Sequence, residues 1–346
     1  MSVISESPRK LLIIKPSALG DIVHSLPFLY AVKKKFPELS VHWIVAKGLH
    51  TFLEGHPLID KLWVINKDNW KKLSCLPQTL KEISALSSGL KKERFDISVD
   101  LSGLLRSGLM TWASRARVKL GFKESDEGSP FFYTHKIEGG TEIHAIDRYL
   151  KIAQFLGCDI SDIQYPFAPY DENPPVMNRL PRQYAVMVPS AGKEANRWPA
   201  ARFGELASRL PVQSVVVSSK TDAALAEEVV LASKGKAISV AGETGLKELI
   251  AVISKARFLI SNDTGPMHIA AALNVPVFAI FGPANPLRTG PYGDIHTIIR
   301  EDVSCAPCYR WKPCDNWICM EDLTVDKVYR LIHQKNDGMT IAEDQK

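Results

Sequence analysis

The residue best placed to do acid–base chemistry is Asp21, at the end of the segment 15–21 (KPSALGD). The residues from Leu11 to Ile14 have the apolar pattern of a buried strand, and a helical pattern begins at Asp21. A small-residue turn at the carboxyl end of a strand presents backbone N–H groups and a carboxylate to a ligand. The carboxylate could accept a proton there, or it could only cap the helix. The residues alone leave both alternatives open.

A second segment, 261–268 (SNDTGPMH), also leads from a predicted strand into a predicted helix. Gly265 allows close approach of a diphosphate, Thr264 can hydrogen-bond to it, and the helix N-terminus supplies a positive dipole end. Asp263 would repel phosphate, so sugar hydroxyls are its expected partners. The alternative is a capped turn in which His268 is a core residue.

A third segment, 189–199, contains two cations, Lys193 and Arg197, after the first predicted strand of the second half. Both suit a departing diphosphate, although a solvated surface loop would have the same composition. The motifs of P-loop nucleotide-binding proteins, of dinucleotide-binding Rossmann folds and of zincin metalloproteases are absent from the sequence.

Four of the six cysteines lie close together, at Cys305, Cys308, Cys314 and Cys319. In a cytosolic chain such a cluster binds metal more often than it forms disulfides, so we expect zinc or iron in a structural site. Free thiols or an oxidised pair are the alternative, because the second half of the cluster is loosely spaced.

Composition and charge limit the classes of protein to which the chain could belong. The 346 residues include 45% apolar and 23% charged residues, which predicts a soluble globular protein of about two domains. No apolar run could span a bilayer and no signal peptide is recognisable, so we expect a cytoplasmic protein. Residues 33–123 carry 17 Lys and Arg against 8 Asp and Glu, whereas the whole chain has a net charge of only +5. This half should face an anionic partner, a phosphorylated substrate or a membrane surface, unless the charges lie only on solvated helix faces.

The elements that must position these residues alternate between strand and helix patterns in both halves. This alternation predicts two doubly wound Rossmann-like α/β domains that face a cleft. A proline-rich segment at 165–182 separates them. We therefore expect an N-terminal domain at 1–175, a C-terminal domain at 176–325, and a closing helix with a frayed tail at 326–346. The predicted elements of the two halves are strands at 11–14, 41–45, 97–101, 184–188, 212–218, 258–261 and 275–281 and helices at 21–36, 80–90, 200–210, 222–233, 246–255, 266–273 and 325–334.

The motifs together resemble those of the ADP-heptose:lipopolysaccharide heptosyltransferases, glycosyltransferase family nine. Residues 15–27 (KPSALGDIVHSLP) are similar to the N-terminal signature of the family, and residues 261–273 (SNDTGPMHIAAAL) to its donor-binding signature. Residues 288–293 (RTGPYG) and the cysteine cluster continue the match. The segment 100–107 (DLSGLLRS), with Gly121 and Tyr133, looks most like heptosyltransferase I.

This resemblance implies a B-type glycosyltransferase fold and an inverting reaction that needs no metal or other cofactor. It also implies that residues 1–175 form the acceptor-binding domain and residues 176–325 the nucleotide-sugar-binding domain. It implies that Asp21 is the general base and that Ser190 touches the diphosphate. The expected donor-binding residues are Ser190, Lys193, Arg197, Asp222, Asp263, Thr264, Gly265 and His268, of which Asp222 would lie near the ribose. The expected acceptor-binding residues are Ser17, Gly20 and Arg106. Asn196 departs from the family, which commonly has Lys there.

We therefore expect an enzyme that moves heptose from ADP-heptose to the Kdo and inner-core region of lipopolysaccharide, with peripheral contact at the cytoplasmic face of the inner membrane. One alternative is a relative that uses another sugar nucleotide or acceptor, because the fold fixes neither. Another is a nucleic-acid-binding protein with a four-cysteine metal site, although no nucleic-acid-binding motif is recognisable and we expect no such partner.

Overall fold

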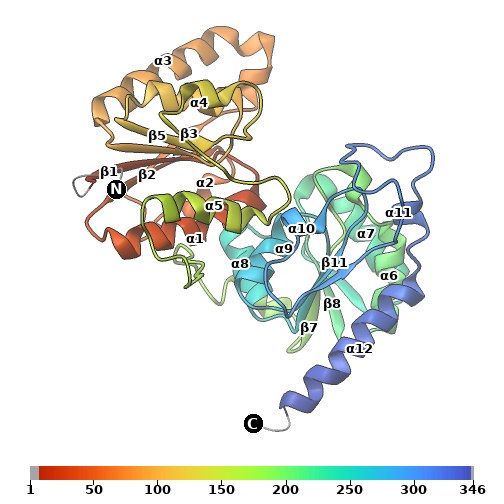
Figure 1. Ribbon diagram of the computed structural model, residues 1–346. Coiled ribbons are helices and arrows are strands. Elements are labelled where there is room, and N and C mark those ends of the chain that lie inside the picture. Colours follow the sequence, from red (N-terminus) through yellow and green to blue (C-terminus); the bar gives the residue numbers. More distant parts are fainter. Residues whose placement is uncertain (1–7, 344–346) are drawn as a thin grey trace. The chain divides into compact units, whose positions relative to one another are not determined.

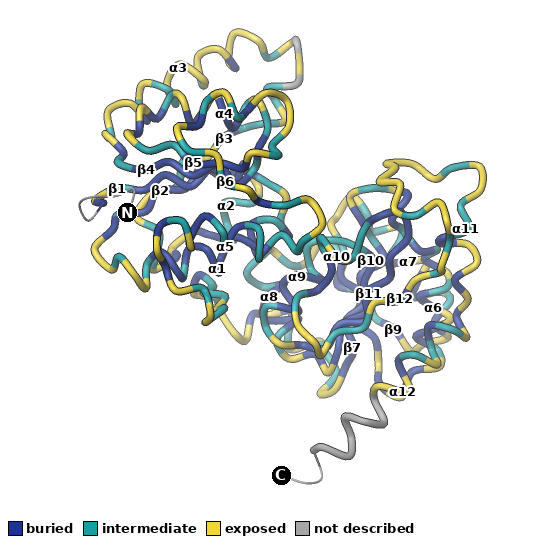
Figure 2. Tube along the Cα trace, in the orientation of Figure 1, coloured by how far each residue is buried: buried dark blue, intermediate teal, exposed yellow. Residues whose placement is uncertain are grey.

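The computed structural model describes the backbone of residues 8–343, and their side chains except those of residues 71, 73 and 336–343. The chain divides into two compact units, Met1–Pro169 and Tyr170–Lys346. Each unit contains one six-stranded parallel sheet with helices on both faces (Figure 1). Figure 2 shows both sheets as buried layers under helices whose outer surfaces are exposed.

Unit 1 has the strand order β3-β2-β1-β4-β5-β6. Its strands are β1 (Lys10–Ile14), β2 (Ser40–Ala46), β3 (Lys61–Ile65), β4 (Ile97–Asp100), β5 (Val118–Phe122) and β6 (His135–Ile137). Its α-helices are α1 (Leu19–Lys35), α2 (His50–Leu53), α3 (Leu76–Glu93), α4 (Leu105–Ala113) and α5 (Ala145–Phe155). Short 3₁₀ turns are η1 (Asn69–Lys71), η2 (Leu73–Cys75) and η3 (Ser129–Phe132).

The core of unit 1 follows from strands that are apolar on both faces. Leu11 to Ile14 of β1 are fully buried, as expected for a central parallel strand covered on both sides. Helices α1 and α5 contact each other on one face of the sheet, and α3 and α4 lie together on the other (Figure 1). Leu90 of α3 and Met110 of α4 pack on Leu12 of β1 within one apolar cluster. Pro27 lies inside α1, which continues through it as a single helix to Lys35.

Unit 2 repeats this topology with the strand order β12-β11-β10-β7-β8-β9. Its strands are β7 (Tyr184–Val188), β8 (Gln213–Val216), β9 (Ala237–Ser239), β10 (Phe258–Asn262), β11 (Val277–Ile280) and β12 (Thr297–Ile299). Its α-helices are α6 (Ala200–Arg209), α7 (Ala223–Ala232), α8 (Leu246–Ser254), α9 (Gly265–Ala272), α10 (Pro286–Thr289), α11 (Ile318–Glu321) and α12 (Val325–Glu343). Its 3₁₀ turns are η4 (Pro175–Arg179), η5 (Glu194–Asn196) and η6 (Lys220–Asp222).

Both sheets have the order of the doubly wound nucleotide-binding fold, in which the connections reverse direction beside the first strand. The reversal falls between β1 and β4 in unit 1 and between β7 and β10 in unit 2. Ligands of such sheets bind beyond the carboxyl ends of the strands at this reversal. The two points are therefore the places to look for function.

The last helix corrects one expectation. The predicted helix at 325–334 continues to Glu343, so most of the segment 335–346 is helical rather than a frayed tail. The core of unit 2 accounts for the first part of this helix, because Val328 and Ile332 are buried against it.

Candidate functional site

The reversal point of unit 1 carries the Asp21 turn. Ile14 of β1 pairs with Asp100 of β4, so the residues after these strands are neighbours. Lys15 directly follows β1, and its ammonium donates a hydrogen bond to the Leu101 carbonyl at 3.0 Å. Asp21 lies in the first turn of α1, and its Oδ2 accepts the backbone N–H of Ala18 at 2.8 Å. The carboxylate therefore caps helix α1, which was one of the two alternatives for Asp21 in the sequence analysis.

Its other oxygen is held by two further donors. Asp21 Oδ1 lies 3.2 Å from the ammonium of Lys15 and accepts a hydrogen bond from the Tyr149 hydroxyl at 3.3 Å. The Lys15 side chain is only 7% exposed, whereas that of Asp21 is 37% exposed. A fixed carboxylate with this much solvent access can reach a proton on a bound substrate.

Charge and burial set the protonation of the two groups that hold Asp21. Burial alone would lower the pKa of Lys15, but the Asp21 carboxylate and Tyr149 outweigh it and raise that pKa. Burial raises the pKa of Tyr149 to about 12, and Asp21 adds to the rise while Lys15 opposes it. Lys15 is therefore charged and the Tyr149 hydroxyl is a donor near neutral pH. Neither residue was singled out from the sequence, although Lys15 was part of the motif.

The expected acceptor residues lie at the same edge of the sheet. Ser17 Oγ accepts a hydrogen bond from the Lys67 ammonium at 2.9 Å, and Gly20 is buried in the first turn of α1. Arg106 is half-buried in the first turn of α4, directly after β4 and its loop. A cavity of about 500 Å³ lies beside β3 and α3 and is lined by Lys47, Trp63, Val64, Ile65, Asn66, Trp70, Gln78, Glu82, Ala85 and Leu86.

The segment that leads into α4 is held by a buried carboxylate. Asp100 accepts hydrogen bonds from the backbone N–H groups of Ser102 and Gly103 and from the Tyr133 hydroxyl, the last at 2.7 Å. Burial raises the pKa of Asp100, and these hydrogen bonds oppose the rise. A Cβ at Gly121 would lie 2.2 Å from the Tyr133 ring, so only glycine leaves room for it. These residues of the heptosyltransferase I resemblance thus have a structural task, which is to fix the loop before Arg106.

The reversal point of unit 2 brings the other two segments together. Ser261 of β10 pairs with Val188 of β7, so Asn262 lies beside Pro189 and donates a hydrogen bond to its carbonyl at 2.8 Å. Asn196 donates a hydrogen bond to the Asp263 carboxylate at 3.0 Å, across 67 residues of chain. Ser190 follows Pro189 directly and is partly exposed at the same place.

The cations of this site have anionic or aromatic neighbours. The Arg197 guanidinium lies 3.4 Å from the Asp222 carboxylate, whose other oxygen accepts a hydrogen bond from the Ser219 hydroxyl. The Lys193 ammonium lies 5.4 Å from the centre of the Trp311 ring and 6.0 Å from that of Tyr309. Both interactions leave the cations partly accessible, which an anionic ligand requires.

At the start of α9, Thr264 is the N-cap residue but makes no side-chain hydrogen bond to the helix. The Thr264 hydroxyl is thus not used to cap the helix, although a capped turn was the alternative to a ligand-binding role for this segment. Gly265 begins the helix, where a backbone N–H that has no partner inside the helix can bind an anion. His268 is buried, as the core alternative requires.

Asn196 is nearly inaccessible, and its Oδ1 has no hydrogen-bond partner within the described part of the chain. A buried acceptor of this kind is costly unless something donates to it. Asn196, which stands where the family commonly has Lys, therefore lies against Asp263, and its Oδ1 lacks a hydrogen-bond donor among the described residues.

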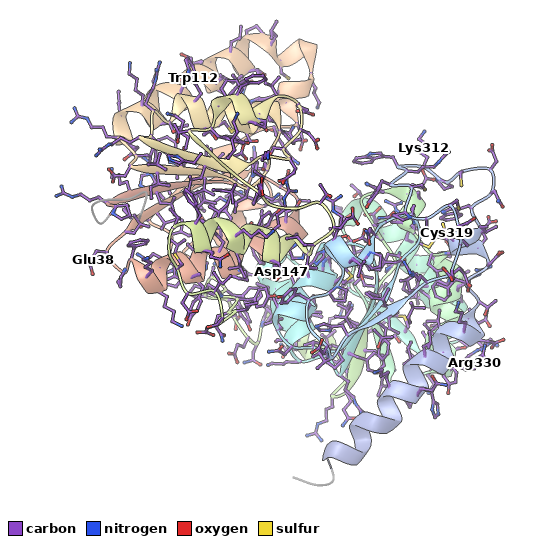
Figure 3. All side chains as sticks on the ribbon, in the orientation of Figure 1. Glu38, Trp112, Asp147, Lys312, Cys319 and Arg330 are labelled. Atoms are coloured by element: carbon purple, nitrogen blue, oxygen red, sulfur yellow. The ribbon has the colours of Figure 1, made fainter. Side chains whose placement is uncertain are left out.

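The cysteines do not form the expected site. Cys305 and Cys308 are exposed on the loop before α11, whereas Cys319 of α11 is buried in the core of unit 2. Figure 3 shows Lys312 on this loop and Cys319 at α11. Burial and the three neighbouring cysteines raise the pKa of Cys319 to about 11. Among the described residues no three His, Cys, Asp or Glu are arranged to hold a metal ion, so the four thiols do not fit one in this arrangement.

The cysteine loop has another, structural contact. The Trp311 carbonyl accepts the Ala195 N–H at 3.1 Å, and the Trp317 indole donates to the Ala195 carbonyl at 3.0 Å. The loop therefore packs on the segment that carries Lys193, Asn196 and Arg197.

Two doubly wound units, each with polar side chains gathered at its reversal point, define an α/β protein of the nucleotide-binding class. Glycosyltransferase family 9 (heptosyltransferase) matches this chain over residues 83–317. The chain belongs to this family, and it is a glycosyltransferase.

Relatives with assigned names are similar along most of their length. Lipopolysaccharide heptosyltransferase 1 of Pseudomonas aeruginosa is 28% identical over 320 residues, which cover 88% of this chain and 87% of the relative. The lipopolysaccharide core heptosyltransferase OpsX of Haemophilus influenzae is 25% identical over 309 residues, covering 86% of each chain.

Solved structures show the same fold. The structure of E. coli heptosyltransferase WaaC with ADP has a TM-score of 0.75 at 22% identity and covers 94% of this chain and 99% of the other. E. coli ADP-heptose heptosyltransferase II has a TM-score of 0.76 at 21% identity and covers 97% and 99%. The B-type glycosyltransferase fold expected from the sequence is confirmed. The described residues contain no helix long and apolar enough to cross a membrane.

Proposed function

We propose that this chain transfers heptose from ADP-heptose to a hydroxyl of the Kdo and inner-core region of lipopolysaccharide, at the cytoplasmic face of the inner membrane. The observation that carries the proposal is the arrangement at Asp21, a carboxylate fixed by Lys15, Ala18 and Tyr149 at the reversal point of unit 1. Family membership and the named heptosyltransferase relatives support this donor and this acceptor.

In the reaction, the acceptor hydroxyl oxygen attacks the anomeric carbon and its proton passes to the Asp21 carboxylate. The bond from the anomeric carbon to the diphosphate breaks, and ADP leaves with the electron pair. Attack opposite the leaving group inverts the configuration at this carbon. The base and the stabilisation of the leaving group each contribute ~10²–10⁴ in rate.

The donor is held by the reversal point of unit 2. The diphosphate is bound, and its departing charge stabilised, by Ser190, Lys193, Arg197 and the backbone N–H of Gly265. Thr264 hydrogen-bonds to the diphosphate, Asp222 accepts from the ribose, and Asp263 accepts from a heptose hydroxyl beside His268. The buried Oδ1 of Asn196 would accept from the donor, which satisfies its missing hydrogen bond.

The acceptor is bound by Ser17, Gly20 and Arg106. Arginine recognises carboxylate and phosphate in a bidentate manner, and Kdo carries a carboxylate. Arg106→Ala should raise the Michaelis constant for the acceptor more than that for ADP-heptose. An equal rise in both constants would give Arg106 a structural role instead.

Mass spectrometry of the products tests the proposed reaction. The protein is incubated with ADP-heptose and acceptors that end in Kdo, with Kdo and one heptose, or with neither, and in parallel with other sugar nucleotides. We expect one heptose added to the Kdo-terminated acceptor, as by heptosyltransferase I. Transfer from another sugar nucleotide, or only to the acceptor that already carries heptose, would contradict this assignment.

A metal held by Cys305, Cys308, Cys314 and Cys319 stays a prediction that needs the cysteine loop to rearrange. Elemental analysis of anaerobically purified protein tests it, and a stoichiometric metal lost in the Cys305→Ser variant would support it.

A further inference from the structure

Helices α3 and α4 in unit 1 expose several large apolar side chains to water. A helix that covers a sheet normally presents charged and polar residues to water. On α3, however, Leu76, Leu80 and Ile83 are exposed at a spacing of four and three residues. They form one stripe along the first half of the helix, whereas Leu90, near the other end of the helix, packs in the core.

Helix α4 repeats the pattern. Leu105, Leu109 and Trp112 are exposed at the same spacing, while Met110 packs in the core. Trp112 is 49% exposed and is labelled in Figure 3 on the side of the unit where α3 and α4 lie. Phe131, in the 3₁₀ turn η3 that packs on α4, is 89% exposed.

The two stripes lie on neighbouring helices. Helices α3 and α4 contact each other on the same face of the sheet (Figure 1). An exposed apolar surface of several large side chains on neighbouring elements marks a contact with a protein or a membrane. We call this surface, made of Leu76, Leu80, Ile83, Leu105, Leu109 and Trp112, the apolar face.

Exposed cations accompany the apolar face, and one of them, Arg115, lies over the Trp112 ring at 4.6 Å. Exposed cations on and after the two helices are Lys81, Lys91, Lys92, Arg94, Arg115 and Arg117. No salt bridge joins any of these six to an acidic residue in the part of the chain that the structure describes. The acidic side chains of α3 face inward, because Glu93 pairs with Lys10 and Lys61 and Glu82 accepts from Trp70.

We infer that the apolar face docks on an anionic lipid surface, with its leucines and Trp112 in the headgroup region and the cations on lipid phosphates. Large apolar side chains bordered by Lys and Arg are typical of helices that lie in a membrane interface, where Trp is favoured. A second copy of the chain fits less well, because a two-fold contact through this face would bring two sets of these cations into one interface.

The position of the apolar face agrees with the proposed function, on which this part of the inference rests. Helices α3 and α4 follow strands β3 and β4, so their first turns lie at the carboxyl edge of the sheet. Ser17, Asp21 and Arg106 lie at that same edge. Docking through these helices brings a lipid-anchored acceptor to the edge that carries the base.

Vesicle flotation tests the docking directly. The full chain is mixed with vesicles of phosphatidylcholine alone or of phosphatidylcholine with phosphatidylglycerol. We expect flotation only with the anionic vesicles, and weaker flotation as salt increases. The double variant Leu109→Ser and Trp112→Ser should lose binding by about tenfold or more, because both apolar side chains leave the interface. Leu231→Ser, at a still more exposed leucine of α7 in unit 2, is the control and should float like the wild type.

A charge variant, Arg115→Gln with Arg117→Gln, should lose about 25-fold in binding to anionic vesicles, since each cation near the surface contributes about a 5-fold factor. The inference is overturned if the wild type does not float, if the Leu109 and Trp112 variant floats normally, or if neutral vesicles bind equally well. It is also overturned if sedimentation shows a dimer that the double variant dissociates while no vesicle binding occurs.

Transfer assays separate this inference from the proposed function. With a lipid-free Kdo acceptor, the Leu109 and Trp112 variant should keep wild-type turnover, whereas transfer to acceptor embedded in vesicles should fall about tenfold. If the wild type transfers heptose to neither acceptor, the proposed function fails and the flotation result still decides the docking.

Discussion

Asp21 is fixed by donors from three places in the chain, namely its own turn, the end of β1 and helix α5. Ala18 and Lys15 are local, but Tyr149 is 128 residues away and reaches the carboxylate only because α5 packs beside α1. Two donors on one oxygen leave the carboxylate little freedom to rotate. The geometry suits a base that must meet one hydroxyl in one orientation.

Tyr149 is therefore a positioning residue with a measurable effect. Tyr149→Phe keeps the ring and removes the hydroxyl that donates to Asp21 at 3.3 Å. We expect turnover to fall by about 3- to 10-fold, and the acidic limb of the pH–rate profile to move to higher pH, since a donor that stabilises the carboxylate is lost.

The pH profile distinguishes this role from packing alone. A variant with lower turnover at every pH but an unmoved acidic limb would show that Tyr149 only fills space. Tyr184→Phe is the matched control, because its buried hydroxyl donates to a backbone carbonyl in unit 2, away from Asp21.

At the scale of elements, the loop between β4 and α4 depends on the space left by one glycine. In a Gly121→Ala variant the added methyl would overlap the Tyr133 ring, and the ring could not keep its hydrogen bond to Asp100. We expect a loss of about 1–3 kcal/mol of stability, as for other overpacked cores. Gly192→Ala, which has open space around it, should have a near-normal melting temperature.

An equally low melting temperature for both glycine variants would show that the cost comes from elsewhere than the Tyr133 contact. A normal melting temperature for Gly121→Ala would show that the loop adjusts without cost.

The end of α3 is tied to two strands through Glu93, which accepts hydrogen bonds from Lys10 of β1 and Lys61 of β3 at 2.7 Å each. These bonds lower the pKa of Glu93 from 4.5 to about 2. Because the folded-state pKa is below the unfolded value, the stabilisation is present above about pH 4.5 and is lost as the pH falls toward 2.

Glu93→Gln should thus cost about 1–2 kcal/mol at neutral pH, allowing for solvent screening of the exposed lysines. Urea unfolding at several pH values measures the difference, which should shrink as the pH falls below about 4.5. Glu138→Gln breaks a fully exposed pair with Lys123 and should have no measurable effect. A difference between wild type and Glu93→Gln that stayed constant down to low pH would contradict this assignment.

At the scale of the whole molecule, the two doubly wound units could be predicted because their central strands are continuous apolar runs. Leu11 to Ile14 and Tyr184 to Val188 are buried on both faces, and such runs are visible in the sequence. The strands β3, β5, β6, β9 and β12 were not predicted. Four of them are edge strands and β5 lies beside one, and their partly exposed residues give no clear period.

The motifs predicted which turns carry the candidate site, but not the contacts between them. Tyr149 was missed because helix α5 carries no motif, and its role depends on packing against α1. The bond from Asn196 to Asp263 joins segments 67 residues apart and requires β7 and β10 to be neighbours. The metal expected at the four cysteines stays a prediction without support among the described residues, and spacing alone does not reveal that Cys319 is buried in the core.

The measurement that tests the account most directly is the turnover of the Asp21→Asn variant, paired with its affinity for ADP-heptose and its melting temperature. An asparagine side chain still accepts the Ala18 N–H and so still caps α1, but it cannot take a proton. We predict that turnover falls by about 10²-fold or more while donor affinity and melting temperature stay nearly unchanged. Near-wild-type turnover in the folded Asp21→Asn protein would contradict the account and leave Asp21 with the capping role alone.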